Sequence, residues 1–159
     1  MIKIREANEA DLKNIAEVVV VCFSNDFGDK NIALNWVKER FNLRTFSRYH
    51  ISEMDGKVVG YIYNKMLGGT SGILELEQIG IDPEYQGKGI GKMLILESEK
   101  FWKSYLKNKY NKNIHKFILT TAKVNNQAHN LYAKCGFKYE CTIKNLYYGK
   151  DEEIWVKTY

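Results

Sequence analysis

The chain alternates between two hydrophobic patterns, and each change of pattern marks a predicted element. Residues 2–5 alternate apolar with basic side chains, which is typical of a short strand. Apolar side chains then recur every three or four positions over residues 12–23 and over residues 32–41, which predicts two amphipathic helices. Asn8 or Asp11 can cap the first helix. The segment between the helices contains Asn, Asp and Gly and is expected to form a loop.

A tight hairpin is predicted next. Residues 49–54 and residues 58–66 are rich in strand-forming side chains, and Asp55-Gly56 between them tolerates the positive φ angles of a short turn. After a glycine-rich turn, another strand is predicted over residues 73–81. Asp82-Pro83 should end this strand, because proline has no N–H to donate to a sheet.

The second half of the chain predicts a long helix, then strands and one further helix. Apolar side chains from Ile90 to Tyr105 form a stripe at helical spacing. Asn125 or Asn126 can cap the later helix, and Cys135-Gly136 can end it, since glycine readily adopts the left-handed cap conformation. The remaining predicted elements are a strand over residues 117–122, a helix reaching Lys134, and strands over residues 138–147 and 153–158.

Composition agrees with one mixed α/β domain over residues 1–159. Of the 159 residues, 45% are hydrophobic and 27% are charged, and only one is proline. Three cysteines form no disulfide framework and suit a reducing compartment, while no apolar run approaches the roughly 20 residues of a membrane helix or resembles an export signal. We therefore expect a cytoplasmic protein. The net charge of +5 favours a polyanionic partner, either nucleic acid or a phosphorylated cofactor.

A glycine-rich loop follows the strand that ends at Ile81 and leads into the long helix. Glycine lets the backbone approach a ligand closely, and the N–H groups at a helix start attract anions, so the loop is suited to binding phosphate. It matches neither the Walker A nor the Rossmann dinucleotide pattern. Taken alone, it could also be a simple strand-to-helix turn. The loop reads Gln86-Gly87-Lys88-Gly89-Ile90-Gly91-Lys92.

A second motif favours the ligand-binding interpretation. Residues 86–91 match Gln/Arg-x-x-Gly-x-Gly/Ala, and residues 125–137 match Asn-x-x-Ala-x-x-Leu-Tyr-x-x-x-Gly-Phe. Over about residues 48–157 the chain thereby resembles the GNAT superfamily of N-acetyltransferases, in which both motifs occur in this order. The resemblance implies a central mixed, mostly antiparallel sheet of six or seven strands flanked by about four helices. The pantetheine arm would insert where the strand ending at Ile81 and the strand ending at Ala122 splay apart.

The resemblance implies acetyl-CoA as co-substrate. Backbone groups of Ile79, Gly80 and Ile81 would pair with the pantetheine arm, and Asn125 would reach the pantetheine or the phosphate end. The lysines of the loop could add positive charge, or could be a solvated surface pair. The pyrophosphate would lie in the loop formed by Gln86, Gly87, Lys88, Gly89, Ile90, Gly91 and Lys92.

The implied reaction is direct attack of a primary amine on the thioester in a ternary complex. Tyr132 stands where the family places the tyrosine that protonates the departing thiolate. Glu77 and Glu75 project to one face of an apolar strand, and either could be the base, with Glu77 preferred; pairing with lysines across the sheet is the alternative. In RimI-like enzymes, which acetylate the N-termini of ribosomal proteins, a glutamate stands at the position of Thr120, so the chain departs from them there.

The acceptor remains open between a protein N-terminus, a lysine and a small-molecule amine such as a polyamine. Tyr147-Tyr148 resembles the hairpin with which RimI-like enzymes clamp a substrate backbone, although aromatic pairs on hairpins often only pack together. A GNAT-like fold could also be a catalytically silent acyl-CoA sensor. The basic and aromatic side chains of residues 100–116 could instead form a nucleic-acid-binding module, for which a solvated helix end is the simpler interpretation.

No metal site is expected, because His50, His115 and His129 are scattered and have no cysteine or carboxylate at ligand spacing. The expected oligomeric state is a monomer or a homodimer.

Overall fold

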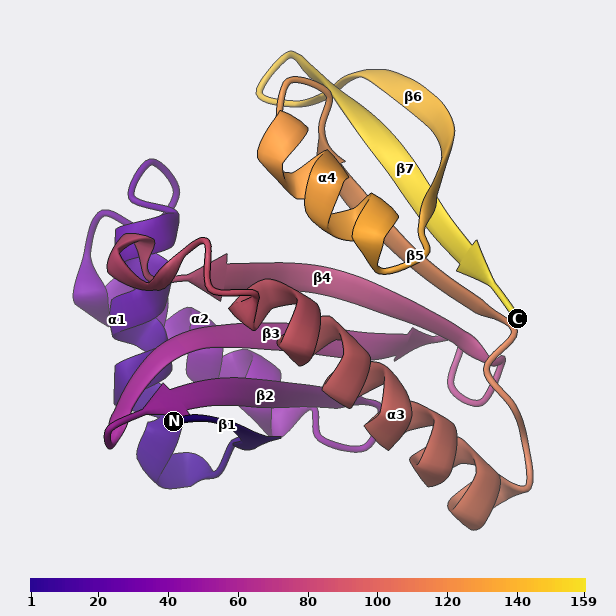
Figure 1. Ribbon diagram of the computed structural model, residues 1–159, viewed down its shortest axis with the longest axis horizontal. Helices are drawn as coiled ribbons and strands as arrows, with labels where there is room; N and C mark the ends of the chain where they lie inside the picture. The colour runs from indigo at the N-terminus through magenta and orange to yellow at the C-terminus, as the bar shows by residue number, and fades with distance from the viewer. The chain divides into compact units, whose positions relative to one another are not determined.

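The structure is a computed structural model that describes residues 1–159, and seven strands and four α-helices follow one another in the predicted order (Figure 1). The sheet has the strand order β1-β2-β3-β4-β5-β7-β6. β4 and β5 run parallel, whereas β1 with β2, β5 with β7 and β6 with β7 are antiparallel, which confirms the predicted mixed, mostly antiparallel sheet. The elements are β1 (Ile2–Glu6), α1 (Leu12–Cys22), α2 (Lys30–Asn42), β2 (Ser47–Met54), β3 (Lys57–Leu67), β4 (Ile73–Ile81), α3 (Ile90–Tyr110), β5 (Lys116–Ala122), α4 (Asn126–Lys134), β6 (Lys138–Tyr147) and β7 (Lys150–Thr158).

Turn and cap chemistry accounts for several element boundaries. Asp55 and Gly56 adopt φ angles of 51° and 79°, which confirms the predicted tight turn between β2 and β3. Asn8 caps a short 3-10 helix over Glu9–Asp11, since its side chain accepts from the backbone N–H of Ala10 at 2.9 Å, whereas Asp11, the residue before α1, makes no side-chain cap hydrogen bond to that helix. Asp29 caps α2 by accepting from the N–H groups of Asn31 and Ile32, so this helix begins at Lys30, two residues before the predicted start.

The chain forms two compact units. The first comprises residues Met1–Asn64 and Gln78–Ser98, and the second comprises Lys65–Glu77 and Glu99–Tyr159. In the first unit, α1 and α2 bury one apolar face each in a core shared with β2 and β3, where Ile15, Val37 and Ile51 are fully buried. None of the four helices is long and apolar enough to cross a membrane.

In the second unit, α4 packs on one face of the strands β5 and β7 (Figure 1). The ring of Phe137, which follows α4 and contacts the ring of Tyr132, lies 5.0 Å from that of Phe117 on β5, and the ring of His129 in α4 stacks 5.1 Å from that of Trp155 on β7. Because successive side chains of a strand point to opposite faces, the residues next to Phe117 and Trp155 point away from α4. This alternation gives the second unit one helix-covered face and one face that α4 leaves open.

The aromatic side chains of α3 that raised the possibility of base stacking pack against one another. Trp102 is fully buried, and its ring lies edge-on to Phe101 and Tyr105 at 5.5 and 5.4 Å. Nearby, the buried carboxylate of Glu99 contacts the ammonium groups of Lys103 and Lys157, each at 2.7 Å. This part of α3 therefore contributes a core stripe and an internal ion-pair network.

Candidate active site

The glycine-rich loop ends where α3 begins, at Ile90. Gly87 and Gly89 both have a φ angle of 77°, and no atom lies within 4 Å of a Cβ built at either position. The backbone conformation, rather than crowding, thus requires glycine there. Residues 86–89 are exposed, and the first N–H groups of α3 have no partner within the helix. The loop consequently presents an open anion site at a helix N-terminus.

Gln86 holds this loop against the end of β4. Its Nε2 donates to the carbonyl oxygen of Ile81 at 3.0 Å. Asp82, the next residue after Ile81, accepts from the N–H of Glu84 at 3.1 Å and pairs with the Lys57 ammonium at 3.2 Å. Of the two lysines in the loop, Lys88 places its ammonium 4.8 Å from the centre of the Tyr85 ring, and Lys92 is exposed. The hydrogen bond from Gln86 to Ile81 therefore gives Gln86 a structural role, because it fixes the loop to the end of β4.

Gly80, at the end of β4, is in a crowded position. A Cβ there would lie 2.8 Å from the Tyr61 ring and 3.3 Å from the Cys22 sulfur, so only glycine fits. The Cys22 thiol donates to the carbonyl oxygen of Ile81 at 3.3 Å. Burial raises the pKa of this thiol to about 11, which keeps it protonated at neutral pH and unsuited to nucleophilic attack. Ile79 and Ile81 flank Gly80 and are half-buried.

Tyr132 lies in α4, in the second unit, and only 5% of it is exposed. Burial raises the pKa of its hydroxyl well above the ordinary value, and the neighbouring Cys135 adds to the shift. The hydroxyl therefore stays protonated at physiological pH and is able to donate a proton. Asn125 starts the helix, because its Oδ1 accepts from the N–H of Ala128 at 3.1 Å, and Gly136 at φ 89° follows its end.

The two candidate bases share one lysine. The Lys65 ammonium lies 2.8 Å from a Glu77 oxygen and 3.2 Å from a Glu75 oxygen, and both carboxylates are partly buried. The ladder between β4 and β5 joins residues 73–76 to residues 116–119, so Glu77 stands one residue beyond it. Lysine pairing across the sheet is therefore present for both glutamates, and neither is excluded as the base.

The structure divides the residues expected from the sequence into two groups. Its first unit holds the glycine-rich loop with Ile79, Gly80 and Ile81, and its second unit holds Tyr132, Asn125 and the two glutamates. Sequence reasoning missed Glu152, a carboxylate on β7 of which only 8% is exposed. Burial raises the pKa of Glu152, and the charge of Lys150 opposes this shift. The signal for Glu152 was its place in an acidic run that leads into a predicted strand.

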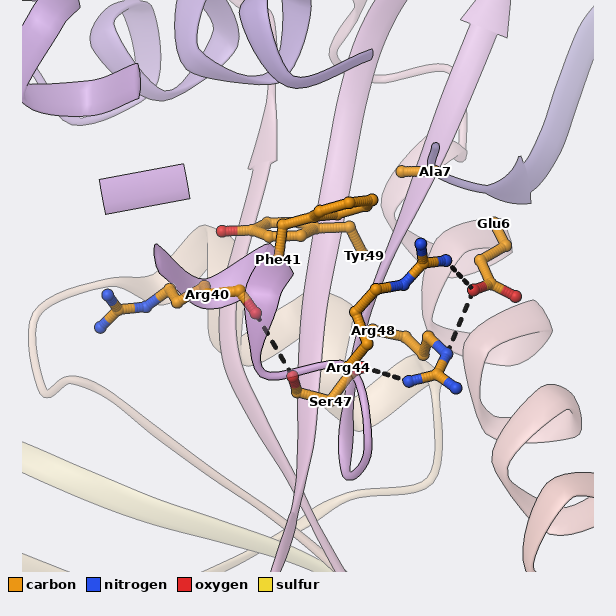
Figure 2. A pocket seen from close by; sticks show the side chains of 8 residues that line it. All are labelled: Glu6, Ala7, Arg40, Phe41, Arg44, Ser47, Arg48 and Tyr49. Carbon is orange, nitrogen blue, oxygen red and sulfur yellow. Dashed lines mark hydrogen bonds and ion pairs between the residues drawn. The ribbon is translucent and has the colours of Figure 1, made fainter. Parts of the chain in front are cut away.

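A separate shallow pocket lies in the first unit (Figure 2). Two arginines on its wall converge on one carboxylate: Arg44 and Arg48 contact the same Glu6 oxygen at 3.2 and 3.1 Å. The third arginine, Arg40, points its guanidinium away from the other two (Figure 2) and stacks on Trp36 at 3.8 Å. Neither recognised motif contributes to this pocket. Elsewhere, no three His, Cys, Asp or Glu side chains lie together in a way that could hold a metal ion.

Comparison with known proteins identifies the family. The acetyltransferase (GNAT) family matches residues 12–137. An N-alpha-acetyltransferase from Sulfurisphaera tokodaii is 30% identical over 117 residues, which cover 68% of this chain and 66% of that protein. A spermidine N(1)-acetyltransferase from Thermoplasma acidophilum is 27% identical over 157 residues, covering 89% of this chain and 91% of that protein.

A solved structure shares the whole fold. The PaiA N-acetyltransferase from Thermoplasma acidophilum, in complex with coenzyme A, superposes with a TM-score of 0.74 at 26% identity, covering 100% of this chain and 99% of that one. The motifs, the fold and these matches agree with one another. The chain belongs to the acetyltransferase (GNAT) family and is an acyltransferase that uses acetyl-CoA as its co-substrate.

Proposed function

We propose that the chain transfers the acetyl group of acetyl-CoA to a primary amine of a small polyamine, by direct attack within a ternary complex. The observation that carries the choice of acceptor is the extent of the likeness to the spermidine N(1)-acetyltransferase, which covers 89% of this chain and 91% of that protein. The resemblance to the family implies that the N-terminal region shapes the acceptor pocket, and a match over 89% of the chain includes most of that region. We also propose that the reaction takes place in the cytoplasm, in agreement with three free cysteines.

Each site residue then has a stated role. The N–H groups of residues 87–92 bind the pyrophosphate, with the charges of Lys88 and Lys92 in support. Backbone groups of Ile79, Gly80 and Ile81 hold the pantetheine arm, and Asn125 reaches its phosphate end. Gln86 fixes the loop through its hydrogen bond to Ile81.

Proton transfer needs two further groups. Glu77 removes a proton from the acceptor ammonium, the amine nitrogen bonds to the thioester carbonyl carbon, and the carbon–sulfur bond breaks. Tyr132 gives its proton to the departing thiolate of coenzyme A, in keeping with the raised pKa of its hydroxyl, and the second proton that the nitrogen loses as the amide forms restores this hydroxyl. Glu75 is the second candidate for the base, because it shares the Lys65 ammonium with Glu77.

Thermal unfolding with added ligand tests the cofactor site first. A ligand at about one hundred times its Kd stabilises a protein by about 2.7 kcal/mol, which raises the midpoint by a few degrees. Acetyl-CoA and coenzyme A should both produce this rise, and NAD should not. Release of free thiol from acetyl-CoA in the presence of spermidine then tests turnover. Stabilisation by acetyl-CoA without turnover of any amine would instead indicate an acyl-CoA sensor.

A protein N-terminus is the second candidate acceptor, favoured by the Sulfurisphaera N-alpha-acetyltransferase and by the hairpin between β6 and β7. Tyr147 is 56% exposed and Tyr148 is 84% exposed, so both rings lie at the surface, where a peptide could contact them. A peptide with a free N-terminus and a peptide with an acetylated N-terminus, assayed beside spermidine, separate the two acceptor classes. Turnover of the free peptide alone would reject the polyamine.

A further inference from the structure

Glu152 is a buried carboxylate to which the structure gives no ion pair and no hydrogen bond. Its two acidic neighbours on β7 differ from it. Asp151 accepts from the N–H of Asn145 at 3.3 Å, and Glu153 accepts from the indole N–H of Trp155 at 3.0 Å. Burial of such a carboxylate lowers the stability of a folded protein, because the charge of Lys150 offsets only part of the hydration that Glu152 loses. The placement of Glu152 therefore calls for a ligand.

Strand register fixes the face to which Glu152 points. It stands opposite Ala122 of β5 and Ile143 of β6, in a regular part of the ladder between β5 and β7. Trp155 packs against α4, so Glu152 and Ile154 point to the opposite face. Glu75 pairs with Ile118, the residue next to Phe117, and so lies on the same face as Glu152. We call this the carboxylate face; it is formed by Glu75, Glu77, Ile118, Thr120, Glu152 and Ile154.

Charge and apolar surface on the carboxylate face suit an extended polycation. Glu75 and Glu77 already bind one primary ammonium group, that of Lys65, at 3.2 and 2.8 Å. Lys116, Lys138 and Lys150 also stand on this side of the sheet, and none of them forms an ion pair with the three carboxylates. Ile118 and Ile154 are half-buried and offer apolar surface to methylene groups. Ammonium groups joined by methylene chains are complementary to this arrangement.

The distance between the strands decides which nitrogen Glu152 can serve. β5 lies between β4 and β7, and Glu77 stands beyond the end of the ladder between β4 and β5, so Glu77 and Glu152 are at least two strand spacings apart, roughly 10 Å or more. One ammonium group cannot contact both carboxylates at this separation. Resting on the polyamine acceptor proposed above, we infer that Glu152 binds a second ammonium group of the acceptor, one that is not acetylated, and thereby selects diamines and polyamines over monoamines.

The test compares two acceptors that differ only in the second nitrogen, 1,4-diaminobutane and butylamine, with wild-type protein and Glu152→Gln. The wild type should favour the diamine in kcat/KM. Glu152→Gln should lower kcat/KM for the diamine by about tenfold, mainly through KM, and leave butylamine within about twofold. Glu152→Asp, which restores the charge on a shorter side chain, should recover part of the loss.

Two controls make the result specific. Glu140→Gln removes an exposed carboxylate from β6 and should change neither acceptor. Retention of the acetyl-CoA-induced rise in unfolding temperature shows that Glu152→Gln is folded and binds the cofactor. Equal losses on both amines would place Glu152 at the reacting nitrogen, and no loss on either would give it no contact with the acceptor; each result overturns the inference. A wild type that turns over neither amine refutes the proposed acceptor itself, before any variant is compared.

Discussion

Tyr132 is buried, and its hydroxyl forms no hydrogen bond within the protein, so the hydroxyl can contact a ligand. Its pKa is raised by burial, so the proton is present at every physiological pH, and its removal by mutation should affect the leaving thiolate most. Tyr132→Phe should lower kcat by about a hundredfold and change the Kd for acetyl-CoA by less than about twofold. Steady-state kinetics and calorimetry measure the two quantities. Tyr139→Phe, on exposed β6, is the matched control, and an unchanged kcat in folded Tyr132→Phe would remove the acid role.

Glu77 and Glu75 differ in one geometric respect, since Glu77 lies just beyond the ladder that β4 forms with β5. A base must be ionised to act, so kcat/KM should rise with pH as it loses its proton. Glu77→Gln should abolish this rise and lower kcat/KM by about a hundredfold, while Glu75→Gln should keep it. The pH–rate profiles of the two variants measure the difference. A profile that survives in Glu77→Gln and disappears in Glu75→Gln would exchange the two assignments.

His50 makes the stability of the fold depend on pH. Burial, helped by the nearby Arg48 charge, lowers the pKa of this side chain to about 4, against about 6.5 in an unfolded chain. The unfolded state therefore binds the proton more tightly, and the free energy of unfolding should fall by about 3 kcal/mol as the pH drops from about 6.5 to about 4. Urea unfolding across this range measures the slope. His50→Gln should flatten it, and an equal slope in the variant would exclude His50 as its source.

At single positions, the sequence allowed a prediction for residues that belong to a motif, but not for a residue whose chemistry depends on its surroundings. Gly87, Gly89 and Tyr132 could be found because a fixed spacing accompanies them. Glu152 could not, because the strand was predicted to begin at Glu153, which left Glu152 in the hairpin with no side assigned to it. Its burial follows from β7 starting at Lys150 and from the neighbouring strands β5 and β6.

At the scale of the elements, the cap residue Asn125 stabilises α4, the helix that contains Tyr132. Asn125→Ala should lower the free energy of unfolding by about 1 kcal/mol, because the N–H of Ala128 loses its acceptor, whereas Asn125→Ser should keep most of the stability. The same pair tests the proposed contact with acetyl-CoA. A cofactor contact by the amide predicts weaker acetyl-CoA binding in both variants. Normal binding in Asn125→Ser would limit Asn125 to the capping role.

Predicted elements agree with the structure wherever the hydrophobic period is regular. β4, α4 and β6 have the predicted bounds, and the other elements differ at their ends by one to a few residues. The largest extension is that of α3, which continues to Tyr110 through a stretch rich in lysine. Lysine has a high helix propensity but does not contribute to an apolar stripe, so the hydrophobic pattern ended before the helix did. The terminal residues of the elements therefore depend on local cap and turn chemistry rather than on the hydrophobic period.

At the scale of the whole molecule, strand order is the property that a single sequence shows least. β5 pairs with β7, although α4 and β6 lie between them along the chain, and β6 lies at the edge of the sheet. Local patterns contain no information on such partners, so the strand order was not predicted. The division into two compact units arises in the same way, because each unit combines separated stretches of the chain.

Net charge is the other property of the whole molecule, and it bears on the cofactor. A chain of charge +5 attracts the phosphates of acetyl-CoA, so the association rate should fall several-fold between about 50 and 500 mM salt. Two double variants separate the general field from local contacts. The first combines Lys88→Gln and Lys92→Gln, in and beside the loop. The second combines Lys107→Gln and Lys112→Gln, around the C-terminal end of α3, and removes the same amount of charge. At physiological salt, screening acts over about 8 Å, so the first pair should slow association measured by stopped flow far more than the second. Equal effects would mean that the field of the whole chain, and not the lysines at the loop, guides the cofactor to its site.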